Sequence, residues 1–268
     1  MSSELARVEP TPFCSASDLA SAKSRFDDIE IEVTADGSLS RTESNSPVAP
    51  QSDLMLKAAK WLKERYQVSQ GARFGIHKRI PIGGGLGGGS SDAATCLLAL
   101  NRLWGLDLSL DELAQAGSQL GADVAVFVRG EAAWAEGVGE LLEPIDLRPE
   151  IYLLIDPKVS VSTAEIFAAE ELTRTNDPLT IRAFLQDAGH NVCVPVVRMR
   201  YPAVAEALDW LGNFTTARMS GTGACVFGSF DSLEAAEEVK SRVPENWVSW
   251  VVNGLNRSPV HQQLGLLT

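Results

Sequence analysis

Apolar and polar residues alternate most clearly at 29–33, where Ile29, Ile31 and Val33 are separated by two glutamates. A period of two predicts a strand with one face buried. Between Ser52 and Tyr66, apolar residues instead return every three or four positions, which predicts an amphipathic helix. The stretch 72–80 predicts another strand, which should end before proline 81 because proline cannot donate a ladder hydrogen bond.

The rest of the chain mixes both periods. Helices are expected over 91–103, from the capping box Ser109-x-x-Glu112 to residue 120, over 163–169, 181–186 and 203–211, and from a cap at Asp231 to residue 243. Buried strands are expected at 124–128, 132–136, 151–155, 225–230 and 247–252. The polar stretch 36–51 predicts a loop, and residues 1–27 show no clear period. Because strands and helices mingle without strict βαβ alternation, the pattern favours an α+β fold.

A glycine-rich loop between a predicted strand and a predicted helix is the most informative stretch. Glycine accepts positive φ and has no Cβ, so successive N–H groups can turn toward one anion. The helix that follows adds its positive N-terminal end, and two serines add hydroxyl donors. The loop therefore predicts a cradle for nucleotide phosphates. It consists of Pro81, Ile82, Gly83, Gly84, Gly85, Leu86, Gly87, Gly88, Gly89, Ser90 and Ser91.

Two other interpretations of this loop remain open. A flexible linker is one, although linkers do not normally join a strand directly to a well-patterned helix. A dinucleotide fingerprint, Gly83-x-Gly85-x-x-Gly88, also fits formally and would indicate an NAD(P)-dependent oxidoreductase. That fingerprint needs an acidic residue after a second strand, and Asp107, at the right spacing, is predicted to lie between two helices. A Walker-type loop is excluded because no Gly-Lys-Ser/Thr follows.

Composition narrows the possible partners. The formal net charge is −12, which argues against nucleic-acid binding. Apolar runs are far shorter than the roughly 18–20 residues that cross a bilayer, and the first residues do not resemble a secretory signal. The four cysteines are widely spaced without a C-x-x-C pair, which indicates reduced thiols and a cytoplasmic protein. The partner we expect is a small molecule, and we expect the protein to be a monomer or homodimer.

The three histidines are expected to have structural or surface roles. They are His77, His190 and His261.

Three motifs resemble those of the galactokinase–homoserine kinase–mevalonate kinase–phosphomevalonate kinase (GHMP) superfamily. They are PIGGGLGGGSSDAA at 81–94, GADVAVFVRG at 121–130 and SGTGACVF at 220–227. The resemblance extends from about residue 29 to 261. It implies a two-domain fold, with an N-terminal α+β ATP-binding domain over 1–145 and a C-terminal ferredoxin-like domain over 146–268. The doubled triple glycine resembles those members that phosphorylate a hydroxyl of a cytidine-diphosphate-linked sugar alcohol in non-mevalonate isoprenoid synthesis.

The resemblance also implies roles for single residues. The loop 81–91 would bind the phosphates of ATP, with Mg²⁺ accompanying the nucleotide and no protein ligand for the metal identified. Asp123 matches the family's catalytic aspartate, although from the sequence alone it could equally be a turn or cap residue. Phe167 matches an aromatic residue that stacks on the cytosine of the substrate. Gly221 and Gly223 match the third motif, which closes over the site.

Two departures from the family pattern accompany the resemblance. Ala125 stands where the family usually has proline after Gly-Ala-Asp-Val. The family's Pro-Ala-Lys-Leu-Asn strand, with its catalytic lysine, and its Asp-Gly-Tyr-His segment have no counterpart at 1–27, where Lys23 is only a superficial echo. A nucleotide-binding but catalytically impaired homologue is therefore the competing expectation.

Overall fold

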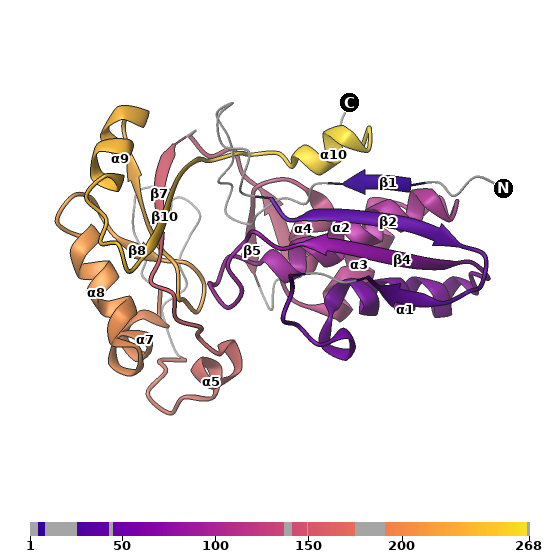
Figure 1. Ribbon diagram of the computed structural model, residues 1–268, viewed down its shortest axis with the longest axis horizontal. Helices are drawn as coiled ribbons and strands as arrows, with labels where there is room; N and C mark the ends of the chain where they lie inside the picture. Colours follow the sequence, from indigo (N-terminus) through magenta and orange to yellow (C-terminus); the bar gives the residue numbers. More distant parts are fainter. Residues whose placement is uncertain are drawn as a thin grey trace.

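Two units lie side by side in the computed structural model (Figure 1). The structure describes residues 5–8, 26–42, 45–136, 141–148, 150–174 and 191–266. The first unit is a sheet covered by helices, and the second is a smaller sheet with helices of its own. This arrangement confirms the predicted two-domain α+β fold. The predicted boundary at 145/146 stays a prediction.

The sheet of the first unit has four strands in the order β1-β2-β4-β3. Strand β2 (Asp28–Thr34) pairs antiparallel with both β1 (Leu5–Val8) and β4 (Gly71–His77), and β3 (Leu39–Arg41) runs parallel to β4. The predicted alternation holds in β2, where Ile29 and Ile31 are fully buried and Glu30 is exposed. The antiparallel centre of this sheet does not match the parallel sheet that a dinucleotide-binding fold requires.

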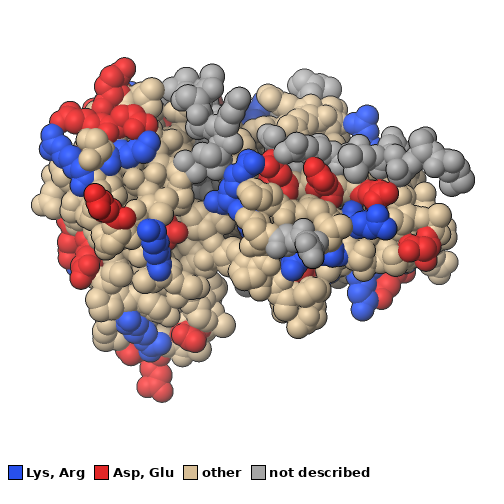
Figure 2. Space-filling view, in the orientation of Figure 1, with Lys and Arg blue, Asp and Glu red and all other residues tan. Residues whose placement is uncertain are grey.

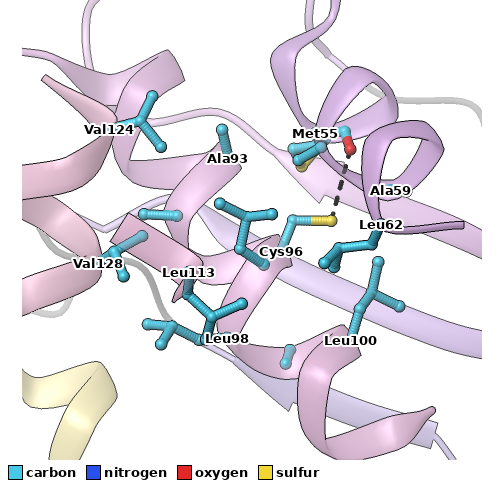
Figure 3. Packing of buried hydrophobic residues seen from close by; sticks show 14 of the residues in the cluster. Met55, Ala59, Leu62, Ala93, Cys96, Leu98, Leu100, Leu113, Val124 and Val128 are labelled. Carbon is cyan, nitrogen blue, oxygen red and sulfur yellow. Dashed lines mark hydrogen bonds between the residues drawn. The ribbon is translucent and has the colours of Figure 1, made fainter. Parts of the chain in front are cut away.

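Helix α2 (Gly88–Leu103) forms the centre of the first unit, because all ten residues from 91 to 100 are buried. It packs against α1 (Leu54–Tyr66) and α4 (Val124–Arg129), and α3 (Leu110–Leu120) packs on α4. Figure 3 shows Met55 and Leu62 of α1 facing Cys96 and Leu100 of α2. The Cys96 thiol donates to the Met55 carbonyl oxygen at 3.6 Å. This contact fixes the helix whose first turn borders the glycine loop.

The second unit has an antiparallel sheet in the order β10-β7-β9-β8, as expected of a ferredoxin-like domain. Its helices pack around a second core centred on Leu153, Ile155 and Leu211. The strands are β7 (Ile151–Asp156), β8 (Arg218–Met219), β9 (Val226–Phe230) and β10 (Val248–Asn253), and the helices are α5 (Thr163–Ala168), α7 (Val194–Arg200), α8 (Pro202–Leu211) and α9 (Leu233–Lys240).

The chain crosses between the units twice, and the two crossings are tied together. A small hairpin of β5 (Ala133–Glu136) and β6 (Leu141–Pro144) precedes the outward crossing. On the return, Asn256 accepts from the Leu147 backbone N–H at 2.9 Å and donates to its carbonyl at 2.8 Å. Helix α10 (Pro259–Gln263) then packs on the core of the first unit through Val260. The last described helix therefore lies with the first unit.

Several sequence predictions are wrong in detail. Residues 124–128 form helix α4 and not the predicted strand. The sequence did not show this helix because all five residues are buried, so that no polar face reveals the helical period. Helix α2 begins at Gly88, three residues before the expected start, so its first turn includes part of the loop. The expected loop 36–51 contains strand β3 and the short 3-10 helix η1 (Pro50–Ser52). Helix α9 is capped by Ser232 and not Asp231.

Some predictions lie outside the described residues, among them Lys23 and the helix at 181–186. Besides β3 and η1, the described elements that were not predicted are β1, β6, α7, β8 and α10. They are short, between two and seven residues, so neither period repeats often enough to be recognised. Within the described ranges, no helix is both long and apolar enough to cross a bilayer.

Candidate active site

A cavity of about 840 Å³ is lined by residues of both units. In the view of Figure 2 the surface is notched between the units, and acidic and basic side chains are interspersed over both. The first unit contributes the glycine-rich loop, the start of α2 and Asp123. The second unit contributes Thr163, Phe167, Asn191 and Thr222, among others. The fold thus brings together residues of three motifs, the most distant of which, Pro81 and Thr222, are 141 positions apart.

The glycine-rich loop needs its glycines for shape. Gly83, Gly85 and Gly87 have φ of 74°, 72° and 66°, a region that other residues rarely adopt. A Cβ on Gly85 would lie only 2.2 Å from the Ser220 carbonyl oxygen. Gly87 is the N-cap of α2, so the next N–H groups have no acceptor within the helix. These donors border the cavity, and their role as a phosphate cradle stays a prediction.

The third motif, which belongs to the second unit, is hydrogen-bonded to the glycine-rich loop of the first unit. The Gly83 carbonyl accepts from the Ala224 N–H at 3.2 Å, and the Gly84 carbonyl accepts from the Cys225 N–H at 3.0 Å. The Ser220 hydroxyl donates to the Gly85 carbonyl at 2.8 Å. Three consecutive loop carbonyls are therefore occupied by the second unit.

Most of the predicted loop and motif residues reach the cavity. Pro81 through Ser90 line it, whereas Ser91 is 1% exposed and does not. Gly221 lines the cavity with its neighbour Thr222. Gly223 has φ of 88° and lies behind them, where a Cβ would be 3.0 Å from the Met219 sulfur. Ser91 and Gly223 therefore do not line the cavity themselves, and they lie next to residues that do.

Asp123 stands at the N-cap of α4, but its side chain caps no backbone N–H. A cap role, which the sequence left open, is therefore excluded. The residue is exposed and lines the cavity. Desolvation by the surrounding protein raises the pKa of its carboxyl group. A carboxylate in this position can accept a proton from a bound alcohol.

Phe167 lies on α5 with 57% of its surface exposed, although it is a large aromatic residue. It lines the cavity from the second unit. Its helix is anchored by the Thr163 hydroxyl, which is 2.9 Å from the hydroxyl of Thr222 in the third motif. An exposed ring on a fixed helix offers a flat surface to a ligand base.

Sequence reasoning missed the buried charged cluster beneath the loop. Lys78 donates to Asp27 and to Asp92, the latter at 2.7 Å, and all three side chains are at least nine-tenths buried. Burial alone lowers the pKa of Lys78, but the two carboxylates raise it above its usual value. Burial raises the pKa of Asp92 to about 8. The only sequence signals were a lysine just after a strand and a carboxylate in the first turn of a helix.

An apolar end of the cavity was missed as well. It lies against the start of α1, which Asp53 caps by accepting from the Met55 N–H at 2.9 Å. Arg41 pairs with the same Asp53. The apolar lining residues there are Val48, Leu54, Met55 and Ile76. For a metal ion, the described part of the chain offers no group of three or more His, Cys, Asp or Glu side chains.

Comparison with known families gives two domain matches. Residues 53–131 match the GHMP kinases N terminal domain, and residues 168–249 match the GHMP kinases C terminal domain. The first match includes the glycine-rich loop and Asp123, and the second includes the third motif.

Full-length relatives agree with these matches. A 4-diphosphocytidyl-2-C-methyl-D-erythritol kinase from Nitrosococcus oceani is 50% identical over 230 residues, which cover 86% of this chain and 82% of the relative. One of the same name from Shewanella woodyi is 46% identical over 91% of this chain and 86% of its own. A solved 4-(cytidine 5'-diphospho)-2C-methyl-D-erythritol kinase superposes with a TM-score of 0.70 at 25% identity, covering 95% of this chain and 100% of that one. Mevalonate kinase from Methanococcus jannaschii shares the fold, with a TM-score of 0.66 at 14% identity over 95% of this chain and 99% of that one.

Proposed function

Because the chain belongs to the GHMP kinases, and among them to the 4-diphosphocytidyl-2-C-methyl-D-erythritol kinases, we propose that it transfers a phosphoryl group from ATP to the 2-hydroxyl of that cytidyl compound. This reaction is a step of non-mevalonate isoprenoid synthesis. The observation that carries the proposal is one cavity shared by the phosphate cradle, the unpaired Asp123 and the exposed ring of Phe167. The comparisons support a kinase over an NAD(P)-dependent oxidoreductase.

The first unit is suited to hold ATP. The unpaired N–H groups of the first turn of α2 would bind the phosphates, with the helix dipole adding to the attraction. The apolar end of the cavity, at Val48, Leu54 and Ile76, has the chemistry to receive the flat adenine ring. Nothing in this arrangement needs a basic surface patch, which fits the acidic composition.

Asp123 is proposed as the general base. The carboxylate would accept the proton of the 2-hydroxyl as its oxygen attacks the terminal phosphorus of ATP, and ADP would leave. Kinases gain most of their rate from positioning and charge stabilisation, so fixing the alcohol in line with the phosphoryl group matters as much as the proton transfer. Helix α4 supplies this fixed position because its first five residues, 124–128, are buried in the core.

The second unit is proposed to hold the cytidyl part. Phe167 would stack on the cytosine ring, and Gly221 and Thr222 would close over the reacting groups. The contact between Thr163 and Thr222 links these two parts of the substrate site.

Magnesium is proposed to enter with ATP as its complex. The ion would be held mainly by phosphate oxygens and water. Bound in this way it would neutralise charge on the phosphates during transfer. We place the reaction in the cytoplasm, in keeping with the free, buried thiols of Cys96, Cys193 and Cys225. A monomer or homodimer remains the expectation.

The test is a kinase assay with the purified chain, ATP, Mg²⁺ and the cytidyl compound, with the phosphorylated product identified by mass. In Asp123→Asn, kcat should fall about 10²–10⁴-fold while ATP affinity stays unchanged, because asparagine keeps the shape but accepts no proton. Asp209→Asn, at a surface ion pair with Arg198, is the matched control. Nucleotide binding without turnover by the wild-type chain would favour the impaired homologue, and unchanged kcat in Asp123→Asn would remove the general base.

A further inference from the structure

Lys78 is a buried cation whose hydrogen bonding is incomplete. Its side chain is 9% exposed, and its ammonium group donates to one carboxyl oxygen each of Asp27 and Asp92. A lysine ammonium has three N–H donors. No third acceptor contacts this nitrogen within the described part of the chain.

A second lysine shows what a purely structural ammonium looks like in this fold. Lys63, in the last turn of α1, donates to the carbonyls of Val68, Ser69 and Gln70 at 2.7, 3.3 and 2.7 Å. Its three donors are all used, and it does not line the cavity. Lys78 differs in both respects.

The Lys78 ammonium lies close to the start of α2, where the phosphate cradle is proposed. A Cβ placed on Gly88, the first residue of α2, would lie 3.3 Å from the Lys78 nitrogen. Lys78 and Asp92 both line the cavity. The ammonium therefore lies beside the helix end whose free N–H groups form the cradle.

Two aspartates fix this position. Asp27 is fully buried, and one of its oxygens accepts from the Arg79 and Ile80 N–H groups at 2.6 and 2.9 Å. These bonds hold the chain just after Lys78, where it leaves β4 and enters the loop. Asp92, the fifth residue of α2, ties the same ammonium to this helix, and its second oxygen, Oδ1, is buried and has no hydrogen-bond partner among the described residues.

The charges around the cavity leave the phosphates few partners. Among the described residues that line it, the charged ones are Asp53, Lys78, Asp92 and Asp123. Lys78 is thus the only described lysine or arginine there. Besides the Mg²⁺ proposed to accompany ATP, the Lys78 ammonium is therefore the positive group that the described lining offers to the phosphate oxygens.

We propose that Lys78 binds the phosphates of ATP directly through its third N–H, with Asp27 and Asp92 as the positioning residues that hold it against the start of α2. This inference rests on the proposed function for the identity of the nucleotide, but not for the second substrate. The loop amides then bind the phosphate chain from one side, and a charged donor binds it from beneath.

The test is equilibrium binding of ATP, ADP and adenosine to Lys78→Met, in which methionine keeps the length of the side chain. Lys78→Met should bind ATP about 10- to 100-fold more weakly, because it loses one charge-assisted hydrogen bond to the phosphates. Affinity for adenosine should stay unchanged because adenosine carries no phosphate. ADP will show whether the contact includes the terminal phosphate.

Lys63→Met is the matched control and should leave the ratio of ATP to adenosine affinity unchanged. If Lys78→Met does not fold, Lys78→Met combined with Asp27→Asn removes both charges, while the asparagine oxygen still accepts from the two backbone N–H groups. Equal losses for ATP and adenosine would assign Lys78 a structural role only, and unchanged ATP affinity would exclude the contact. Because no cytidyl compound is used, failure of the proposed substrate would leave this result intact.

Discussion

Exposure sets Phe167 apart at the scale of single residues. More than half of its surface is open to solvent inside a cavity, where an apolar side chain has little reason to be unless it meets a ligand. Phe167→Ala should raise the KM for the cytidyl compound by roughly 10- to 100-fold, since stacking of a base on an aromatic ring contributes about 1–3 kcal/mol. ATP affinity should not change.

Phe214→Ala provides the comparison for this variant. Phe214 is 37% exposed and packs on Trp210 at the surface of the second unit, outside the cavity. Steady-state kinetics with both substrates varied would separate the effects. A loss shared equally between ATP and the cytidyl compound in Phe167→Ala would argue against stacking.

Asp92 predicts a pH effect. Burial raises its pKa to about 8, so the carboxyl group is mostly protonated at neutral pH and becomes charged as the pH rises. Above pH 8 it gains a negative charge beside the phosphates, and ATP affinity should fall by roughly tenfold between pH 7 and 9. Asp92→Asn should bind ATP equally well at both values. Titrations of ATP at the two pH values would check this, and a parallel fall in the variant would assign the effect to other groups.

At the scale of elements, the glycine-rich loop is shaped by both units. Gly85→Ala would introduce a Cβ against the Ser220 carbonyl at a position of positive φ. Gly105→Ala has a similar φ of 64° but nothing within 4 Å of the new Cβ, so it carries the backbone strain without the clash. Gly105→Ala should lower the free energy of unfolding by about 1–2 kcal/mol, and Gly85→Ala should lower it further because the clash adds to the same strain. Only Gly85→Ala should also weaken ATP binding, and thermal unfolding beside ATP titration would show whether the two effects separate.

The loop was predictable because its chemistry is local. Six glycines between a strand and a helix specify a turn and an anion site without reference to the rest of the chain. The cluster beneath it was not predictable, since Lys78 and Asp27 are 51 positions apart and nothing local pairs them. The strand prediction at 124–128 was wrong for another reason. These residues of α4 are all buried, so the sequence lacks the polar face by which a helix is recognised. The sequence therefore predicts surfaces and motifs well, and buried contacts between distant segments poorly.

At the scale of the whole molecule, α10 fastens the returning chain to the first unit through a buried histidine. His261 Nε2 lies 2.8 Å from the Val128 carbonyl, and Nδ1 is buried without a partner. The ring fills the space beside Gly130, where a Cβ would lie 2.2 Å from it. Burial lowers the pKa of His261, so the folded state favours the neutral ring.

Stability should therefore depend on pH through this residue. Because the unfolded chain binds the proton more readily, the free energy of unfolding should fall as the pH drops below about 6.5, the usual pKa of histidine. His261→Gln should remove this part of the dependence, and His77→Gln, at an exposed position on β4, should not. Tm measured between pH 7.5 and 5 would decide, and identical slopes in wild type and His261→Gln would contradict the assignment.

The paired crossings make the second unit an insertion. It leaves the first unit near Leu147 and returns at Asn256, and these two residues are hydrogen-bonded to each other. A protease that cuts one crossing leaves the units joined by the other, so releasing the second unit takes two cuts. Because the two ends of the second unit are adjacent, the whole unit can be exchanged for that of a relative. The replacement needs only to have its own two ends at the same short separation. Such a chimaera would take its preference for the second substrate from the relative, and it would keep the phosphate loop and Lys78 of this chain.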